Sequence, residues 1–184
     1  MSLKRELDDT YLDDHEWLNQ IMNLYGEELT RIAYLYLKEW NLAEDAVQET
    51  FVKCFQKRAQ FRGDSSQKTW IYTILTNTCK DFLKSAFYKK IVFLGSPHQK
   101  SFPATESAEN LAIIREREYL ICQCVLALPV KYREVIILFY YNSFTIKEIS
   151  NMLRISEAAV RVRLNRGRGK LEKIFTQGGN LDEW

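Results

Sequence analysis

Apolar residues recur three or four positions apart along most of the chain, which is the spacing of an amphipathic helix. Three such stripes occupy residues 29–37, 46–55 and 70–83, and a further short helix is expected at 14–23. The segment Gly63–Ser66 interrupts the pattern between the second and third stripes. We expect these helices to share one core and to form a first domain at residues 14–90.

The helical spacing stops over residues 95–105, which hold two of the chain's three prolines. It resumes at Leu111, and Pro129 suits the first turn of a helix over residues 130–141. We therefore expect a linker at residues 91–108 and a second domain at residues 109–176.

The second domain contains the pattern of a helix-turn-helix. Thr145 and Glu148 can form a capping box that starts a short helix. Arg154 and Ile155 then make a tight turn, and Ser156 is suited to cap the next helix. This arrangement places a second helix in the DNA major groove. The predicted fold is all-α: two small helical domains joined by a linker, the C-terminal one containing a helix-turn-helix.

The second helix of this pair has a polar and basic outer face. At 100° per residue, Val160, Leu164 and Leu171 define its buried side. The other side offers hydrogen-bonding ends for base edges, small residues that permit close approach, and cations for phosphates. These candidate contacts to duplex DNA are Ser156, Ala158, Arg161, Val162, Arg163, Asn165 and Arg166. The alternative is a solvated basic helix.

Composition and charge refine this picture. The 184 residues include only 7 glycines and 3 prolines, so an all-β fold with many hairpins is disfavoured. The net charge of +2 combines a balance of −8 over residues 1–50 with +8 over 51–100, −1 over 101–144 and +3 over 145–184. The two basic blocks indicate two contacts with a polyanion, or else solvated helix faces.

Positive charge occurs beside aromatic residues between positions 55 and 90. Single-stranded DNA requires this combination, because phosphates meet the cations and unpaired bases stack on the rings. The loop Gly63–Ser66 can add polar edges for an extruded base. The candidate contacts are Phe61, Arg62, Ser65, Trp70, Thr73, Asn77, Lys80 and Lys84. The alternative is that Trp70 and Phe82 belong to the core and that the lysines only solubilise the helix.

An acidic strip lies on the polar side of the second predicted helix, at Glu44, Asp45, Gln48 and Glu49. Paired carboxylates can serve acid–base catalysis, but no histidine, nucleophile or metal-ligand cluster accompanies these. A solvated face or docking onto a basic protein partner is the better interpretation.

The four cysteines lack the spacing of zinc ligands, and we expect no metal, cofactor or catalytic residue. The first 14 residues are acidic and have no apolar core like that of a signal peptide. No stretch approaches about 18 consecutive apolar residues. We therefore expect a cytoplasmic protein with no stable membrane insertion of its own.

Together these segments resemble the bacterial extracytoplasmic-function sigma factors, the small two-domain members of the sigma-70 family of RNA polymerase specificity subunits. The resemblance covers about 24–85 and 111–172, in the family's order. Four motifs carry the resemblance. Ala43–Phe51 is similar to the family's core-binding helix, and Phe61–Gly63 with Lys68–Tyr72 is similar to its promoter-melting segment. Asn77–Asp81 is similar to its −10 reading helix, and Leu128–Glu134 with Ala159–Arg166 is similar to its −35 reading domain.

The resemblance implies an alternative sigma factor that binds core RNA polymerase and directs promoter-specific initiation by reading −35 and −10 elements and assisting DNA melting. Asp45, Gln48, Glu49 and Phe51 would contact the core polymerase. The candidates between 61 and 84 would meet the melted −10 strand, and those between 156 and 166 the −35 duplex. The polymerase would do the chemistry in the bacterial cytoplasm, and an anti-sigma factor would hold the protein inactive.

Two other function classes stay open from the residues alone. A stand-alone helix-turn-helix regulator would use the same DNA-binding helices, but it would need its own dimer or ligand surface. A nuclease-like enzyme could use Asp45 and Glu49 with a metal, but it would need a third ligand at a supporting spacing.

Overall fold

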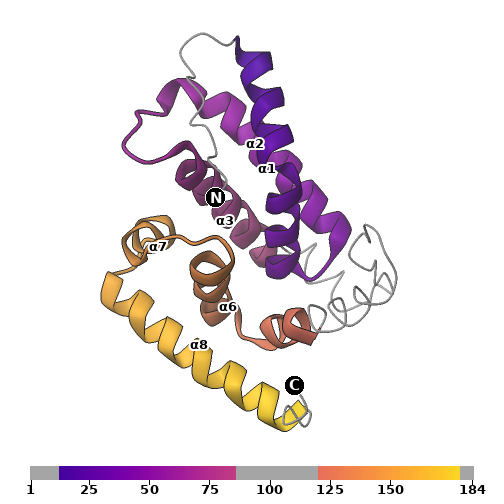
Figure 1. Cartoon of the computed structure of the whole chain (residues 1–184). Helices are drawn as coiled ribbons and strands as arrows, with labels where there is room; N and C mark the ends of the chain where they lie inside the picture. The colour runs from indigo at the N-terminus through magenta and orange to yellow at the C-terminus, as the bar shows by residue number, and fades with distance from the viewer. Residues whose placement is uncertain (1–12, 86–119, 179–184) are drawn as a thin grey trace, which may run out of the picture.

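The computed structural model describes residues 13–85 and 120–178, which contain helices and no strand. They form two helical bodies that pack against each other, drawn in indigo to magenta and in orange to yellow in Figure 1. The expected linker at 91–108 and the adjoining ends of both predicted domains lie outside the described residues.

The first body consists of α1 (Asp14–Leu37), α2 (Trp40–Lys57), a 3-10 turn η1 (Arg58–Gln60) and α3 (Gln67–Lys84). The helix expected at 14–23 and the stripe at 29–37 prove to be one continuous helix. A single glycine inside a helix costs only about 1 kcal/mol, so Gly26 does not end it. The hydroxyl of Thr30 donates to the Gly26 carbonyl oxygen at 2.9 Å.

The core of the first body is built from one face of each helix. Ala43 and Ala46 on α2 are fully buried, and their small side chains let α2 approach its neighbours closely. The large side chains that fill the space between the helices are Trp17, Ile21, Leu29, Ile32 and Leu37 from α1, and Ile71, Tyr72 and Leu75 from α3.

The second body begins with helical residues 120–127. It continues with α6 (Val130–Ile136), a π turn η2 (Ile137–Tyr141), α7 (Ile146–Leu153) and α8 (Glu157–Gly178). The helix expected over 130–141 is present, but its last turn widens, so that Asn142 N donates to Ile137 O at 3.2 Å. Pro129 is the N-cap of α6 rather than a residue of its first turn. Figure 1 shows α8 along the outer edge of this body.

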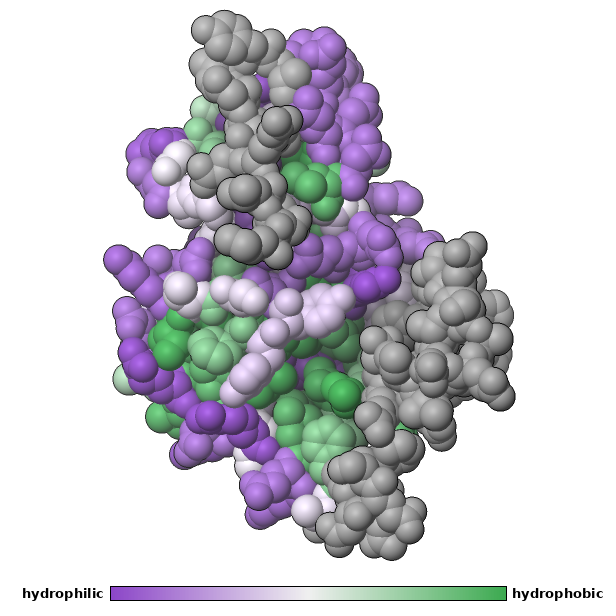
Figure 2. All heavy atoms as spheres, viewed as in Figure 1, coloured by the Kyte–Doolittle hydropathy of each residue, from purple (hydrophilic) through white to green (hydrophobic). Residues whose placement is uncertain are grey.

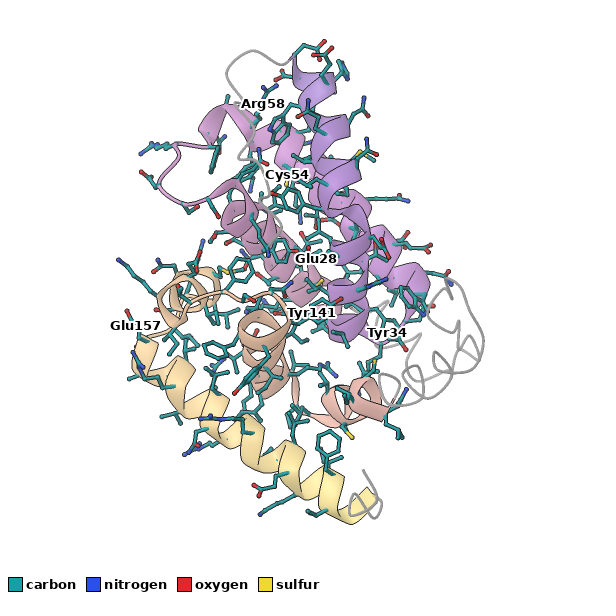
Figure 3. The ribbon with its side chains drawn as sticks, viewed as in Figure 1. Glu28, Tyr34, Cys54, Arg58, Tyr141 and Glu157 are labelled. Carbon is teal, nitrogen blue, oxygen red and sulfur yellow. The ribbon has the colours of Figure 1, made fainter. Side chains whose placement is uncertain are left out.

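Hydrogen bonds join the two bodies, from side chains of the second body to a backbone carbonyl and a side chain of the first. Arg133 on α6, 2% exposed, donates from Nη2 to the carbonyl oxygen of Tyr36 at 3.0 Å. The Asn142 amide donates to Glu28 Oε1 at 2.9 Å. Figure 3 places Glu28 at the side of α1 that faces the second body.

An aromatic contact lies beside these hydrogen bonds. The rings of Tyr72 and Phe144 meet edge to face, with centroids 5.1 Å apart. The Lys68 ammonium lies 5.3 Å from the Tyr72 centroid and 5.2 Å from that of Phe144, and it donates to Asn142 O at 3.3 Å. The start of α3 is therefore held directly against the segment that leads into α7.

Candidate nucleic-acid interface

The helix-turn-helix has the local geometry that its sequence predicts. Thr145 Oγ1 accepts from Glu148 N at 3.2 Å, and Glu148 Oε2 accepts from Thr145 N at 2.9 Å, which confirms the capping box. Arg154 ends α7 in the left-handed conformation, with φ 53°, at a point where such turns often have glycine. The hydroxyl of Ser150 donates across the turn to Ile155 O at 2.6 Å.

The start and the buried face of α8 also agree with expectation. Ser156 Oγ accepts from Ala159 N at 3.1 Å, so Ser156 caps the helix. Val160 is fully buried and Leu164 is 5% exposed. A Cβ on Gly167 would lie 3.1 Å from Cγ1 of Ile136, so glycine is what lets α8 approach α6 this closely.

The opposite face of α8 is open. The Arg161 side chain is 63% exposed and only loosely paired with Glu157, at 3.5 Å. A groove of about 380 Å³, lined in part by Phe139 and Ile146, runs beside Arg161 and Asn165. In the view of Figure 2, apolar residues gather over the middle of the second body, and mostly hydrophilic residues form its lower-left border, where α8 lies. The other exposed candidates on or before α8 are Ser156, Ala158, Val162 and Arg166.

Arg163 differs from the other candidates on α8. Its Nη1 lies 2.7 Å from Oε1 of Glu134 on α6, and its side chain is only 29% exposed. Glu134 also binds Lys80 of α3, with 2.9 Å between Nζ and Oε2. Arg163 and Lys80, both predicted to contact DNA, are therefore paired within the chain in this arrangement, because one carboxylate, 4% exposed, binds both.

Thr69, Thr73, Thr76 and Lys80 fall on one line along α3, at i, i+4, i+7 and i+11, and are called here the α3 stripe. Thr73 and Lys80 were predicted to contact single-stranded DNA, but the stripe that they share is partly covered: Thr69 is 5% exposed and Thr76 is fully buried. The hydroxyls of Thr73 and Thr76 donate to carbonyls of their own helix, at 2.7 and 3.0 Å. Threonines satisfied in this way can be covered, which a helical wheel does not reveal.

Glu148 covers the first residue of the α3 stripe. Thr69 Oγ1 donates to Glu148 Oε1 at 2.9 Å. Burial raises the pKa of Glu148, but hydrogen bonds from Thr145 and Thr69 and the charge of Lys68 more than offset this, so the pKa lies below its ordinary value of 4.5. The cap of α7 is thus also a contact between the two bodies.

The rest of the predicted single-strand surface is partly open. Asn77 is exposed, and the Lys84 side chain is 78% exposed. Arg62 and Ser65 are exposed in the loop before α3, where Gly63 has φ 75°. Phe61 and Trp70 lie against each other, with ring centroids 5.1 Å apart.

Trp70 also contacts Trp17 of α1, at 6.3 Å between ring centroids. Its ring is half-buried between Phe61 and Trp17. The alternative that Trp70 belongs to the core is therefore correct for part of the ring, and the remaining part lies at the surface next to the Phe61 ring.

The acidic strip on α2 is exposed at Asp45, Gln48 and Glu49. Phe51, which we predicted to contact the polymerase, is instead 6% exposed, because it shares the core face of α2 with Val47 and Cys54. Sequence reasoning missed two residues on the outer face: Val52 is 53% exposed and Phe55 is 36% exposed. Their spacing from the acidic strip is the signal that could have identified them, because they continue it by three and four residues per step.

Three of the four thiols, those of Cys54, Cys79 and Cys122, are buried, and that of Cys124 is partly exposed. Burial raises the pKa of Cys54 to about 12 and raises the pKa values of Cys79, Cys122 and Cys124 as well. The described ranges contain no group of three or more histidine, cysteine or acidic residues placed to hold a metal ion. Within residues 13–85 and 120–178, no helix is long and apolar enough to cross a membrane.

Two known protein families match this chain, one in each of the two bodies. The description "Sigma-70 region 2" matches residues 21–86, and "Sigma-70, region 4" matches residues 120–171. The ECF RNA polymerase sigma factor SigW of Bacillus subtilis is 27% identical over 180 residues, covering 94% of this chain and 96% of its own. The ECF RNA polymerase sigma factor SigM of the same species is 28% identical over 168 residues, covering 89% and 98%.

Solved structures share the fold. The sigma factor RpoE of Bartonella quintana, in complex with the anti-sigma factor NepR, is 21% identical and covers 88% of this chain and 98% of its own, with a TM-score of 0.70. CnrH, in complex with the cytosolic domain of CnrY, is 21% identical and covers 90% and 91%, with a TM-score of 0.64.

Proposed function

Since the chain belongs to the extracytoplasmic-function group of the sigma-70 family, we propose how its own residues do the work of a sigma factor. It is an alternative sigma factor, which binds core RNA polymerase and directs promoter-specific initiation. The division of labour that we propose follows the two bodies: the first binds the core enzyme and the melted −10 strand, and the second binds the −35 duplex.

The core polymerase binds the outer face of α2 in this proposal. Asp45, Gln48 and Glu49 are exposed there, and Val52 and Phe55 add apolar area at the C-terminal end of the same face. An acidic strip suits a basic surface and steers association, while the apolar residues supply burial energy. Phe51 acts only by holding α2 in the core.

The loop before α3 and the exposed side of α3 bind the melted −10 strand. In this proposal Asn77 reads a base edge, and Lys84 and Arg62 contact phosphates; all three side chains are exposed. Phe61 and the open part of Trp70 offer rings for stacking, with Ser65 beside them. Thr73 and Lys80 join this surface once the second body has moved away.

The outer face of α8 binds the −35 element in the major groove. Arg161 can form two hydrogen bonds to a guanine, and Asn165 can form two to an adenine. The apolar groove beside these two residues suits a thymine methyl group. Ala158 and Val162 are exposed and have small side chains, so the helix can approach the bases closely. Ser156 and Arg166 are exposed and contact phosphates, whereas Arg163, predicted with them, is held by Glu134 in this arrangement.

The partners are core RNA polymerase, promoter DNA and an anti-sigma factor. We propose the last because RpoE, which shares the fold of this chain, forms a complex with the anti-sigma factor NepR. The family is non-enzymatic, and we propose that this chain has no catalytic residue and acts in the cytoplasm, on the polymerase. No described feature favours a stand-alone regulator.

One observation carries the proposal: the two sigma-70 regions occur in order on one chain, and the second presents a capped helix-turn-helix with an open basic face. Run-off transcription with purified bacterial core polymerase over a promoter library tests it. The chain should confer initiation on a subset of promoters sharing −35 and −10 elements. Core polymerase that gains no promoter selectivity, or a chain that does not co-purify with it, would contradict the proposal.

A further inference from the structure

One carboxylate joins the two candidate DNA surfaces of this chain. Glu134 Oε2 lies 2.9 Å from Lys80 Nζ, and Glu134 Oε1 lies 2.7 Å from Arg163 Nη1. The side chain of Glu134 is 4% exposed, against 26% for Lys80 and 29% for Arg163. Lys80 belongs to the first body and the other two residues to the second, so this three-residue network crosses the boundary between the bodies.

A second carboxylate meets the opposite end of the same surface. Thr69 donates to Glu148 at 2.9 Å, and Thr69 stands three turns of α3 before Lys80, about 16 Å along the helix. The α3 stripe is thus bounded by Glu148 at one end and Glu134 at the other. A carboxylate, like a phosphate, pairs with an ammonium group and accepts a hydrogen bond from a hydroxyl, so Glu134 and Glu148 occupy Lys80 and Thr69, groups that a DNA backbone would otherwise contact.

We propose that Glu134 is an autoinhibitory residue: in the free chain it binds Lys80 in place of a DNA phosphate and holds the second body over the α3 stripe. The bodies must then separate before α3 can bind a single strand along its whole length. This inference rests on the proposed function of α3 and goes beyond it, since it gives a regulatory role to a residue that contacts no DNA.

The cost to DNA binding follows from the populations of the two arrangements. When only a fraction of the chain is open, the apparent dissociation constant rises by the inverse of that fraction. Glu134→Gln removes the charge that binds Lys80 while keeping the size of the side chain. It should therefore increase the open fraction and tighten binding to single strands.

The test uses the full chain as wild type, Glu134→Gln, Lys80→Gln and the double variant. Glu172→Gln is the matched control, because it removes the same charge from an exposed position on α8. Anisotropy of a fluorescein-labelled, random-sequence single strand gives the affinity, and small-angle X-ray scattering gives the radius of gyration. Glu134→Gln should bind the strand more tightly, on the order of fivefold. Its radius of gyration should increase, as should that of Lys80→Gln, while Glu172→Gln matches the wild type.

The double variant identifies the group that Glu134 occupies. With Lys80 replaced, Glu134→Gln should no longer improve DNA binding; a gain that persists would overturn the inference. Unchanged radii of gyration for both Glu134→Gln and Lys80→Gln would also overturn it. Failure of the proposed function gives a different result: no variant binds the strand, even though the radius of gyration increases.

Discussion

The guanidinium of Arg133 donates a hydrogen bond to the carbonyl oxygen of Tyr36, 97 residues earlier in the chain, at 3.0 Å. Tyr36 lies in the last turn of α1, where carbonyl oxygens have no partner within the helix and carry the negative end of the helix dipole. Arg133 also donates to Leu126 O at 2.8 Å. A single buried side chain thus completes the end of α1 and ties it to α6.

Replacing Arg133 by methionine should destabilise the protein by about 1.5–3 kcal/mol, because buried carbonyls lose hydrogen bonds from a charged donor. Thermal unfolding followed by circular dichroism measures this. Lys131→Met, an exposed position on the same helix, is the control and should change little. Equal unfolding temperatures for the two variants would contradict the role given to Arg133.

Two glycines of α8 should respond in opposite ways to alanine. A Cβ on Gly169 meets nothing within 4 Å, so Gly169→Ala should stabilise the helix by about 0.5–1 kcal/mol. At Gly167 the same gain is offset by the contact with Ile136 at 3.1 Å, and overpacking costs about 1–3 kcal/mol. Denaturant midpoints compare them. Ile136→Val, which removes Cδ1 at 3.2 Å but keeps Cγ1, should rescue Gly167→Ala in part. A stabilised Gly167→Ala would show that the α6–α8 contact is loose.

Substitutions at two adjacent residues of α2, Phe51 and Val52, should affect different properties: one the stability of the fold, the other the binding to core polymerase. Val52→Ser should weaken binding to core polymerase about tenfold and leave the unfolding temperature unchanged, since its apolar area is buried only in the complex. Phe51→Ala should cost about 3–5 kcal/mol of stability by leaving a cavity. Surface-bound core polymerase gives the affinities. If Val52→Ser binds like the wild type, the outer face of α2 is not the contact.

Arg161 and Arg166 should affect −35 binding differently. Arg161→Ala should cost about 1–3 kcal/mol on the matched duplex and relax the preference at one base pair. Arg166→Ala should weaken all duplexes alike and lower the salt slope by about one. Titrations on matched and mismatched duplexes at several salt concentrations distinguish the two. The same pattern in both variants would show that the helix is not divided in this way.

Acid should weaken the contact between the bodies through Glu148. Because its pKa is lower in the folded chain than the ordinary 4.5, its contribution to stability is fully present above pH 4.5 and is lost as the pH falls through the lower, folded value. Hydrogen exchange of the α3 amides over this range measures the loss. Glu148→Gln should remove this part of the pH dependence, and a variant with the wild-type profile would contradict it.

Local signals predicted the helix-turn-helix well. The capping box at Thr145, the cap at Ser156 and the buried line of Val160 and Leu164 each depend on residues a few positions apart. Such interactions form within one or two turns, so the sequence contains all the information needed to place them.

Contacts between distant segments were not predictable in the same way. Phe51 is an exception, because it stands four residues after Val47 and three before Cys54, a spacing that already places it on the core side of α2; its assignment to the polymerase contact came with the resemblance. The α3 stripe is polar in sequence but covered in the fold, because its cover comes from residues 134 and 148. One signal was present: Arg133 and Glu134 interrupt an apolar run, and buried charges require partners.

Two contacts between the bodies end on a backbone carbonyl: Arg133 binds that of Tyr36, and Lys68 that of Asn142. Every residue type has a carbonyl oxygen, so a substitution at the acceptor position leaves the acceptor in place. Each of these contacts therefore constrains one position in evolution rather than a coupled pair. Relatives that share about a quarter of their residues with this chain could change residue 142 and still keep the hydrogen bond, provided that the lysine at 68 is inherited.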